Sequence, residues 1–159
     1  MKRFLIPLLL LSIASCRGWD TLRVYEKNVE IPGYSWNDRF ALSFDVNVPD
    51  TSAFYNLYIF IRHTDAYRYS NLWLLITSTY PSQPSKTSRV ELQLSDQDGR
   101  WMGVTMDDVV SQRVPILQQA SFSRTGRYHF SLVQDMRQNP LPHVMSIGLR
   151  LEKTGRHQP

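Results

Sequence analysis

The sequence predicts an all-β domain, an antiparallel β-sandwich or jelly-roll-like fold of about seven to nine strands. Short segments alternate apolar with polar residues, turn residues separate them, and no long segment repeats its apolar residues at the spacing of an amphipathic helix. Two apolar runs, residues 55–61 and 71–77, have strand length and many aromatic or branched side chains. They predict two strands at the centre of the sandwich, with both faces covered.

The N-terminal segment has the features of an export signal. Basic residues come first, residues 4–11 are apolar but too few to span a bilayer, and small residues then lead to Cys16. Residues 13–16 resemble a bacterial lipobox. That resemblance implies cleavage after residues 1–15 and attachment of acyl chains to Cys16, which together anchor a protein firmly to a membrane. The alternative is an ordinary export signal in which the cysteine is incidental.

These features divide the chain into four parts. Residues 1–15 form a lipoprotein signal peptide, residues 16–20 a lipid-anchor linker, residues 21–153 the β-sandwich domain, and residues 154–159 a frayed polar tail. Cys16 is the only cysteine in the sequence, so an intramolecular disulfide is excluded. No later apolar run is long enough for a transmembrane helix.

Charge gives little indication of a partner. The formal net charge is +4, and two of the basic residues lie in the signal peptide. The remaining basic residues are scattered among acidic ones without a block of one sign. This pattern is typical of a mixed solvated surface and does not predict nucleic-acid binding.

The first part of the domain predicts three short elements. Residues 21–26 alternate and form a strand with Leu22 inward, and residues 28–31 form a short edge strand that ends at a proline. Residues 34–38 form a turn, from which Trp36 plugs one end of the sandwich.

Residues 40–48 have the clearest two-residue period in the chain, which predicts a strand with one buried and one wet face. Its inward residues are Phe40, Leu42, Phe44, Val46 and Val48. The two central strands follow, joined by a polar loop.

The middle of the chain predicts a mobile loop and a hairpin. Residues 80–88 contain two prolines and many hydroxyl groups, which disfavour regular structure. Residues 89–104 predict a β-hairpin with a tight turn at Asp98 and Gly99 and a return strand at residues 100–104.

The last third predicts one short helix and two strands. Residues 107–113 form one or two helical turns, capped by an aspartate and ended by Pro115. Residues 127–134 form a strand whose inward side chains are Tyr128, Phe130 and Leu132. After a loop with two prolines, residues 145–152 form the final strand.

No catalytic or metal-binding motif is present. The sequence lacks the Gly-x-Ser-x-Gly, His-Glu-x-x-His and paired-cysteine patterns. The histidines are scattered, which predicts surface positions for all of them: His63, His129, His143 and His157. Asp96 and Asp98 resemble part of a calcium loop but lack the later glutamate, so a hairpin turn is the better interpretation. We therefore predict no enzyme, no metal and no cofactor.

Aromatic residues give the one indication of ligand binding. Tyr67, Arg68, Tyr69 and Trp73 lie close together in the sequence, and aromatic faces beside polar groups suit a sugar ring. A carbohydrate-binding lipoprotein for glycan capture is therefore one hypothesis. In the alternative, Tyr69 and Trp73 are core residues that close the sandwich and Tyr67 lies at its rim.

The order of motifs resembles the gliding motility lipoprotein family GldH of the Bacteroidetes over nearly all of the chain after the signal peptide. The matching pieces are Cys16, residues 24–26, Trp36, residues 40–48 and 55–59, Arg62, residues 69–73, Leu94, residues 98–103, 126–130 and 134–137, Leu141, and residues 147–150.

The resemblance implies a non-catalytic envelope lipoprotein that supports gliding motility and type IX secretion through contacts with a protein partner. It implies no catalytic residues and carries over Cys16 alone. Surface lipoproteins of that phylum tend to have acidic residues after the cysteine, whereas Arg17 follows here. This difference favours the periplasmic side of the membrane.

Overall fold

The computed structural model describes residues 22–156, so the signal peptide, Cys16 and its linker, and His157 lie outside the described part. Eleven strands and one 3-10 turn form this part. They are β1 (Arg23–Glu30), η1 (Pro32–Tyr34), β2 (Ser35–Trp36), β3 (Leu42–Val48), β4 (Ala53–Thr64), β5 (Asn71–Thr79), β6 (Lys86–Gln93), β7 (Val104–Met106), β8 (Val109–Ser121), β9 (Gly126–Gln134), β10 (Leu141–Pro142) and β11 (Val144–Arg156).

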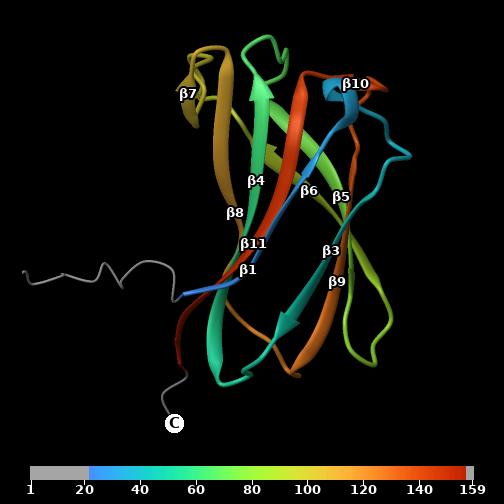
Figure 1. Ribbon diagram of the computed structural model, residues 1–159, viewed down its shortest axis with the longest axis vertical. Coiled ribbons are helices and arrows are strands. Elements are labelled where there is room, and N and C mark those ends of the chain that lie inside the picture. Colours follow the sequence, from blue (N-terminus) through green and yellow to red (C-terminus); the bar gives the residue numbers. More distant parts are fainter. Residues whose placement is uncertain (1–21, 157–159) are drawn as a thin grey trace, which may run out of the picture.

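The strands form two antiparallel sheets that face each other (Figure 1). One sheet has the order β1-β11-β4-β8-β7 and the other has the order β3-β9-β5-β6, while β10 and β2 pair separately at one end. The predicted all-β antiparallel sandwich is thus confirmed. Eight of the strands have seven or more residues, which is within the predicted range of seven to nine strands. The three short strands β2, β7 and β10 bring the total to eleven, above that range.

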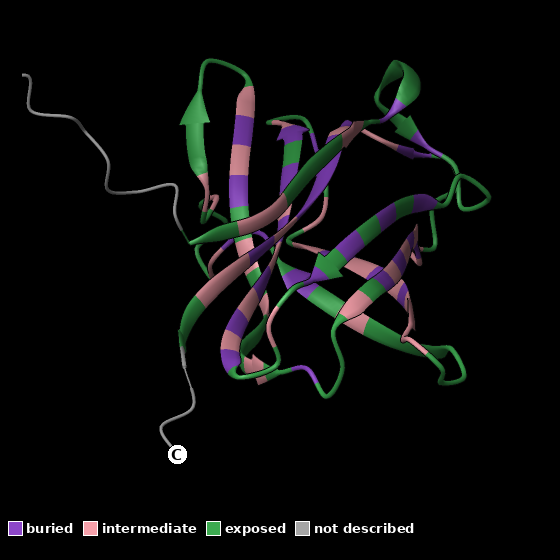
Figure 2. Cartoon of the chain, turned by 60° about the horizontal axis from the view of Figure 1, so that its bottom comes forward, coloured by how far each residue is buried: buried purple, intermediate pink, exposed green. Residues whose placement is uncertain are grey.

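The core lies between the sheets, where alternate side chains of β3, β4, β5 and β9 are buried (Figure 2). Strand β3 buries every second residue, and Phe44 and Val46 are fully covered. From the opposite sheet, Ile59 of β4 and Leu149 of β11 fill the same core. Burying one such side chain contributes about 1.5–3 kcal/mol, so the two-residue period fixes which face of each strand turns inward.

The two apolar runs are central, but in different sheets. Strand β4 lies between β11 and β8, and β5 lies between β9 and β6. Their outer faces are half-buried, as Tyr58 and Phe60 show, so the prediction that both faces are covered is wrong. Antiparallel sheets commonly bury one face only, and aromatic residues on the wet face lengthened the apolar runs.

The start of the domain differs from the prediction in detail. The two predicted elements are one strand, because β1 runs without a break from Arg23 to Glu30 and pairs with β11. Leu22 is exposed at the start of the described chain, and Phe40 is exposed just before β3, so neither points inward. Trp36 is fully buried as predicted, and its indole N–H donates to the carbonyl of Phe40 at 2.9 Å.

The region after β5 contains the largest error in the predicted pairing. Residues 86–88, predicted as loop, begin β6, which pairs with β5. The turn at Gly99 exists, with φ of +80°, but a single bridge joins Ser95 to Trp101. The chain then crosses to the other sheet as β7, because Val104–Met106 pairs with β8.

Residues 107–113 are not helical. Asp107, with φ of +53°, lies in the turn that joins β7 to β8, and the branched Val109 and Val110 already belong to the ladder. Pro115 lies inside β8, where the register shifts and where β7 no longer pairs with it. A proline is tolerated there because its missing N–H faces away from a neighbouring strand.

The end of the chain is more ordered than predicted. Strand β11 continues to Arg156, whose backbone pairs with Ala53, so residues 154–156 of the predicted tail are part of a strand. The start of the described chain lies beside this part of β11, since Lys153 donates its backbone N–H to the carbonyl of Leu22 at 2.7 Å.

Candidate functional site

One of the three described histidines, His63, is not on the surface as predicted. His63 ends β4 with its side chain fully buried, its ring centroid 4.6 Å from that of Trp101. Its Nδ1 lies 2.8 Å from the carbonyl of Thr64, to which it donates. Burial lowers the pKa of His63 below its ordinary value, because desolvation disfavours the charged ring. The strand period could have identified this position, because Ile61 and His63 share one face.

The other two described histidines contact different partners. His129 pairs with Asp45 on the outer face of β9, at 3.0 Å. His143 lies 3.0 Å from the hydroxyl of Thr64. Within residues 22–156, no group of three or more histidine, cysteine, aspartate or glutamate side chains is placed to hold a metal ion.

The structure divides the aromatic cluster that suggested sugar binding. Tyr67 is buried, donates its hydroxyl to the carbonyl of Asn71 at 2.9 Å, and has a pKa raised by that burial. Tyr69 is half-buried with its ring 5.7 Å from that of Tyr67, while Arg68 is exposed. A sugar ring could not stack on Tyr67 without a change in structure.

Trp73 belongs to a different surface. It lies on the outer face of β5, since Leu72 and Leu74 point into the core. The guanidinium of Arg89 lies 4.0 Å from the centre of its ring and covers that face. Trp73 and Tyr67 therefore do not form one aromatic platform.

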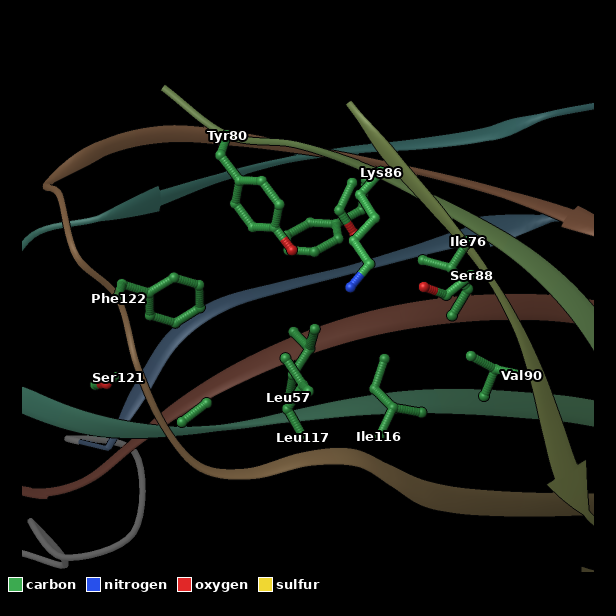
Figure 3. Close-up of a pocket in the computed structure, with 13 residues that line it drawn as sticks. Leu57, Ile76, Tyr80, Lys86, Ser88, Val90, Ile116, Leu117, Ser121 and Phe122 are labelled. Atoms are coloured by element: carbon green, nitrogen blue, oxygen red, sulfur yellow. The ribbon is translucent and has the colours of Figure 1, made fainter. Parts of the chain in front are cut away.

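An apolar groove of about 300 Å³ lies between the edges of the two sheets (Figure 3). We call it the β6/β8 groove, because Ser88 and Val90 of β6 line one side and Ile116 and Leu117 of β8 line the other. Leu57 of β4 is part of its base, beneath these strands.

The shape of β8 opens this groove. The pairing of β8 with β4 shifts register twice, once on each side of Leu57. Gln119 adopts a positive φ of +49°, and its backbone N–H donates to Oδ1 of Asn56 at 2.8 Å. Such bulges bend a strand and increase its twist, and here they accompany an open gap between β8 and β6.

Aromatic rings in contact form the wall at one end of the groove. Phe122 lies edge-on to Tyr55 and to Tyr128, with centroid distances of 5.3 and 4.8 Å, and Tyr128 also packs edge-on against Tyr80. The hydroxyl of Tyr55 donates to the carbonyl of Asp50 at 2.6 Å, which fixes the ring that supports this wall. Edge-to-face pairs of this kind favour one geometry and make the wall rigid.

One cation projects into the groove. Lys86 opens β6 and, like Ser88 and Val90, turns its side chain toward the groove, with its ammonium between the aromatic wall and Leu57 (Figure 3). Its side chain is exposed, and no acidic residue of the described chain forms a salt bridge with it. The groove thus offers an apolar surface with a single positive charge.

The lining of the groove is mostly apolar, with few polar side chains. Hydroxyl groups of Ser78, Ser88 and Ser121 are its small polar side chains, and no histidine or carboxylate of the described residues lines it. A hydroxyl without an adjacent base is a weak nucleophile. The sequence did not indicate the groove, and the one available signal was Pro115, which marks an edge or a bulge in a strand.

The comparisons with known proteins agree over nearly the whole chain. The family model described as GldH lipoprotein matches residues 23–151. A relative from Christiangramia forsetii, named gliding motility lipoprotein GldH homolog, is 27% identical over 158 residues, covering 95% of this chain and 94% of the relative. The gliding motility lipoprotein GldH of Flavobacterium johnsoniae is 26% identical over 153 residues, covering 92% and 94%.

No solved structure matches the chain. Among the described residues, no helix has the length and apolar character needed to cross a membrane.

Proposed function

Because this chain belongs to the GldH lipoprotein family, we propose that it is a lipid-anchored, non-catalytic protein of the bacterial cell envelope that supports gliding motility and type IX secretion through protein contacts. The observation that supports this most directly is the extent of the family match, which includes seven of the eight long strands and β11 as far as Leu151. Both relatives are named for gliding motility.

The anchor of the proposed protein is Cys16, which lies outside the described residues. Several acyl chains on this residue would hold the domain at a membrane, since each buried CH₂ group contributes roughly 0.8 kcal/mol. Confinement raises the effective concentration of the domain for a partner in the same membrane. The basic residue after Cys16 favours the periplasmic side.

The proposed absence of catalysis is supported by the groups that the fold brings together. The β6/β8 groove is apolar, and the buried His63 contacts Trp101 and Tyr67 rather than a serine or a carboxylate. Proteins that act by contact need a shaped surface and a fixed position, and both are provided by the rigid sandwich and its anchor.

The test is deletion of the gene followed by complementation. Loss of movement over agar and loss of a type IX-secreted reporter are expected in the deletion strain, with recovery by the wild-type gene. The Cys16→Ser protein should remain as an uncleaved precursor that takes up no labelled palmitate and restores neither property. Normal movement and normal secretion in the deletion strain would overturn the proposal.

A further inference from the structure

The two sheets leave unpaired strand edges on either side of the β6/β8 groove. Strand β6 is the last strand of its sheet, and β7 covers β8 only from Val109 to Ser111. Each unpaired edge presents backbone N–H and C=O groups that can pair with another extended chain. An apolar hollow between two such edges has the shape left by a strand missing from a sandwich.

We propose that the β6/β8 groove receives an extended segment of a partner protein, which adds as a strand to the edge of β6. This inference rests on the proposed function. It specifies that the contact with the partner protein is made by strand addition. The segment would place apolar side chains in the groove at every second position and a carboxylate beside Lys86.

Strand β6 is the better edge for such pairing. Its ladder with β5 runs from Lys86 to Gln93 without a shift in register, so its free edge is regular. Strand β8 is interrupted by Pro115, which has no N–H, and by the bulge at Gln119. A regular edge can form successive main-chain hydrogen bonds, whereas an interrupted edge cannot.

The length and direction of entry are also limited by the fold. The side chain of Gln112 donates to the carbonyl of Gln93 at 2.9 Å and joins β8 to β6 at one end of the β6/β8 groove. The inserted strand therefore pairs with the part of β6 from Lys86 to Val90, about 13 Å at 3.3 Å per residue, and enters from the end near Tyr80.

Lys86 determines the charge of the occupant. Its ammonium lies among apolar side chains such as Leu57 and Ile116, in a groove without a carboxylate from the described residues. An inward lysine also discourages unspecific pairing at a sheet edge. An aspartate or glutamate in the inserted segment would neutralise the charge of Lys86. The edge would therefore select segments that carry such a carboxylate.

The experiment uses the full lipoprotein in living cells. Benzoylphenylalanine replaces Leu117, an exposed residue on the rim of the groove, and in a control strain it replaces the neighbouring exposed Gln118. After irradiation, an adduct at position 117 and not at 118 is expected, joined to a contiguous protein segment with alternating apolar residues and one carboxylate. Lys86→Glu should lower its yield by about tenfold and Lys86→Arg should not, because like charges across an interface oppose binding.

A second measurement tests the main-chain pairing. A synthetic peptide copied from the crosslinked segment, added to purified full-length protein in detergent, should slow hydrogen exchange at alternate amides of β6. Asn47→Glu, which places a new charge on the exposed face of β3 at the opposite edge of the same sheet, should leave peptide binding unchanged.

Several results would overturn the inference: an adduct with lipid or with a second copy of this chain, equal adducts at positions 117 and 118, no adduct, or binding without protection of β6. Each would leave the proposed function intact if the deletion strain fails to move or secrete. A normal deletion strain would contradict the proposed function even if the groove binds a peptide strand.

Discussion

On one long side of the sandwich, side chains close the gap between the sheets, whereas the opposite side is left open over much of its length. Strands β1 and β3 meet on the closed side, where Lys27 donates to the carbonyl of Ser43 at 3.1 Å and its ammonium lies 5.8 Å from the ring of Phe44. Strands β6 and β8 border the open side. The side chain of Gln112 in β8 joins them by donating a hydrogen bond to the carbonyl of Gln93 in β6.

In this domain, β3 on the closed side contributes more buried apolar packing than β6 on the open side. The closed side contains a regular β3 with alternate residues fully buried, and such packing supplies most of the stability. The open side contains exposed serine and lysine at inward positions of β6, which contribute little to folding. Residues there are available for a contact with another protein.

The largest expected effect comes from the closed side. Phe44→Ala removes a fully buried ring from β3 and should lower the free energy of unfolding by about 3–5 kcal/mol in a urea titration. The matched control is Phe40→Ala, which truncates an exposed phenylalanine just before the same strand and should cost well under half as much. Equal losses would contradict the assigned inward face of β3.

The next effect concerns the bond that joins the two edges of the open side. Gln112→Ala should lower the free energy of unfolding by about 1 kcal/mol, since it removes the bond to the carbonyl of Gln93. It should also speed hydrogen exchange near Gln93. Ser111→Ala, on the other face of β8, is the control and should change neither quantity. If Gln112→Ala leaves the free energy of unfolding unchanged, the hydrogen bond from Gln112 does not stabilise the contact between β8 and β6.

A pH dependence is expected where the loop from β6 to β7 covers His63. Burial lowers the pKa of His63 in the folded protein, so the unfolded chain binds a proton first as the pH falls through about 6.5. The contribution of His63 to the free energy of unfolding is therefore complete above that pH and declines below it. Urea titrations at pH 8 and pH 5.5 should show a smaller pH effect for His63→Gln than for wild type.

The control for this measurement is His143→Gln, which alters a half-buried histidine at the start of β11. It should retain the pH effect of the wild type. An unchanged pH effect in His63→Gln would show that His63 is not the group responsible.

The smallest effect on stability should come from the rim of the groove. Leu117→Ala truncates a side chain that is 43% exposed and should change the free energy of unfolding by about 0.5 kcal/mol or less. If the groove is a docking site, the same variant should impair movement and secretion in cells. A large loss of stability would instead give Leu117 a structural role and weaken the contrast between the two sides.

The sequence predicts best where a strand follows its two-residue period without interruption. The predictions for residues 40–48 and 127–134 give strands with the correct inward faces except at Phe40, because burial of one face selects that pattern. The prediction failed at residues 100–104 and 107–113, where pairing depends on partners distant in sequence. Asp107 can cap a helix or occupy a turn, and only the proximity of β7 and β8 decides between them.

The candidate site was beyond the reach of sequence reasoning for a similar reason. Whether Lys86 is a loop residue or the start of an edge strand depends on which strands end each sheet. The aromatic cluster at residues 67–73 appeared as one feature because sequence proximity does not show which face a residue occupies. In the fold, Tyr67 turns into the core and Trp73 turns out of it.

The pairing of β1 with β11 has a mechanical consequence for an anchored protein. If a lipid on Cys16 anchors the protein as proposed, tension would enter the described domain at Leu22, where the first hydrogen bond joins Leu22 to Lys153. Antiparallel hydrogen bonds lie perpendicular to the strands, so a pull along β1 loads the rungs from Arg23 to Glu30 in shear. Sheared rungs share the load, whereas peeled rungs break one after another. A pull along the strand axis is therefore the direction in which this domain best withstands force.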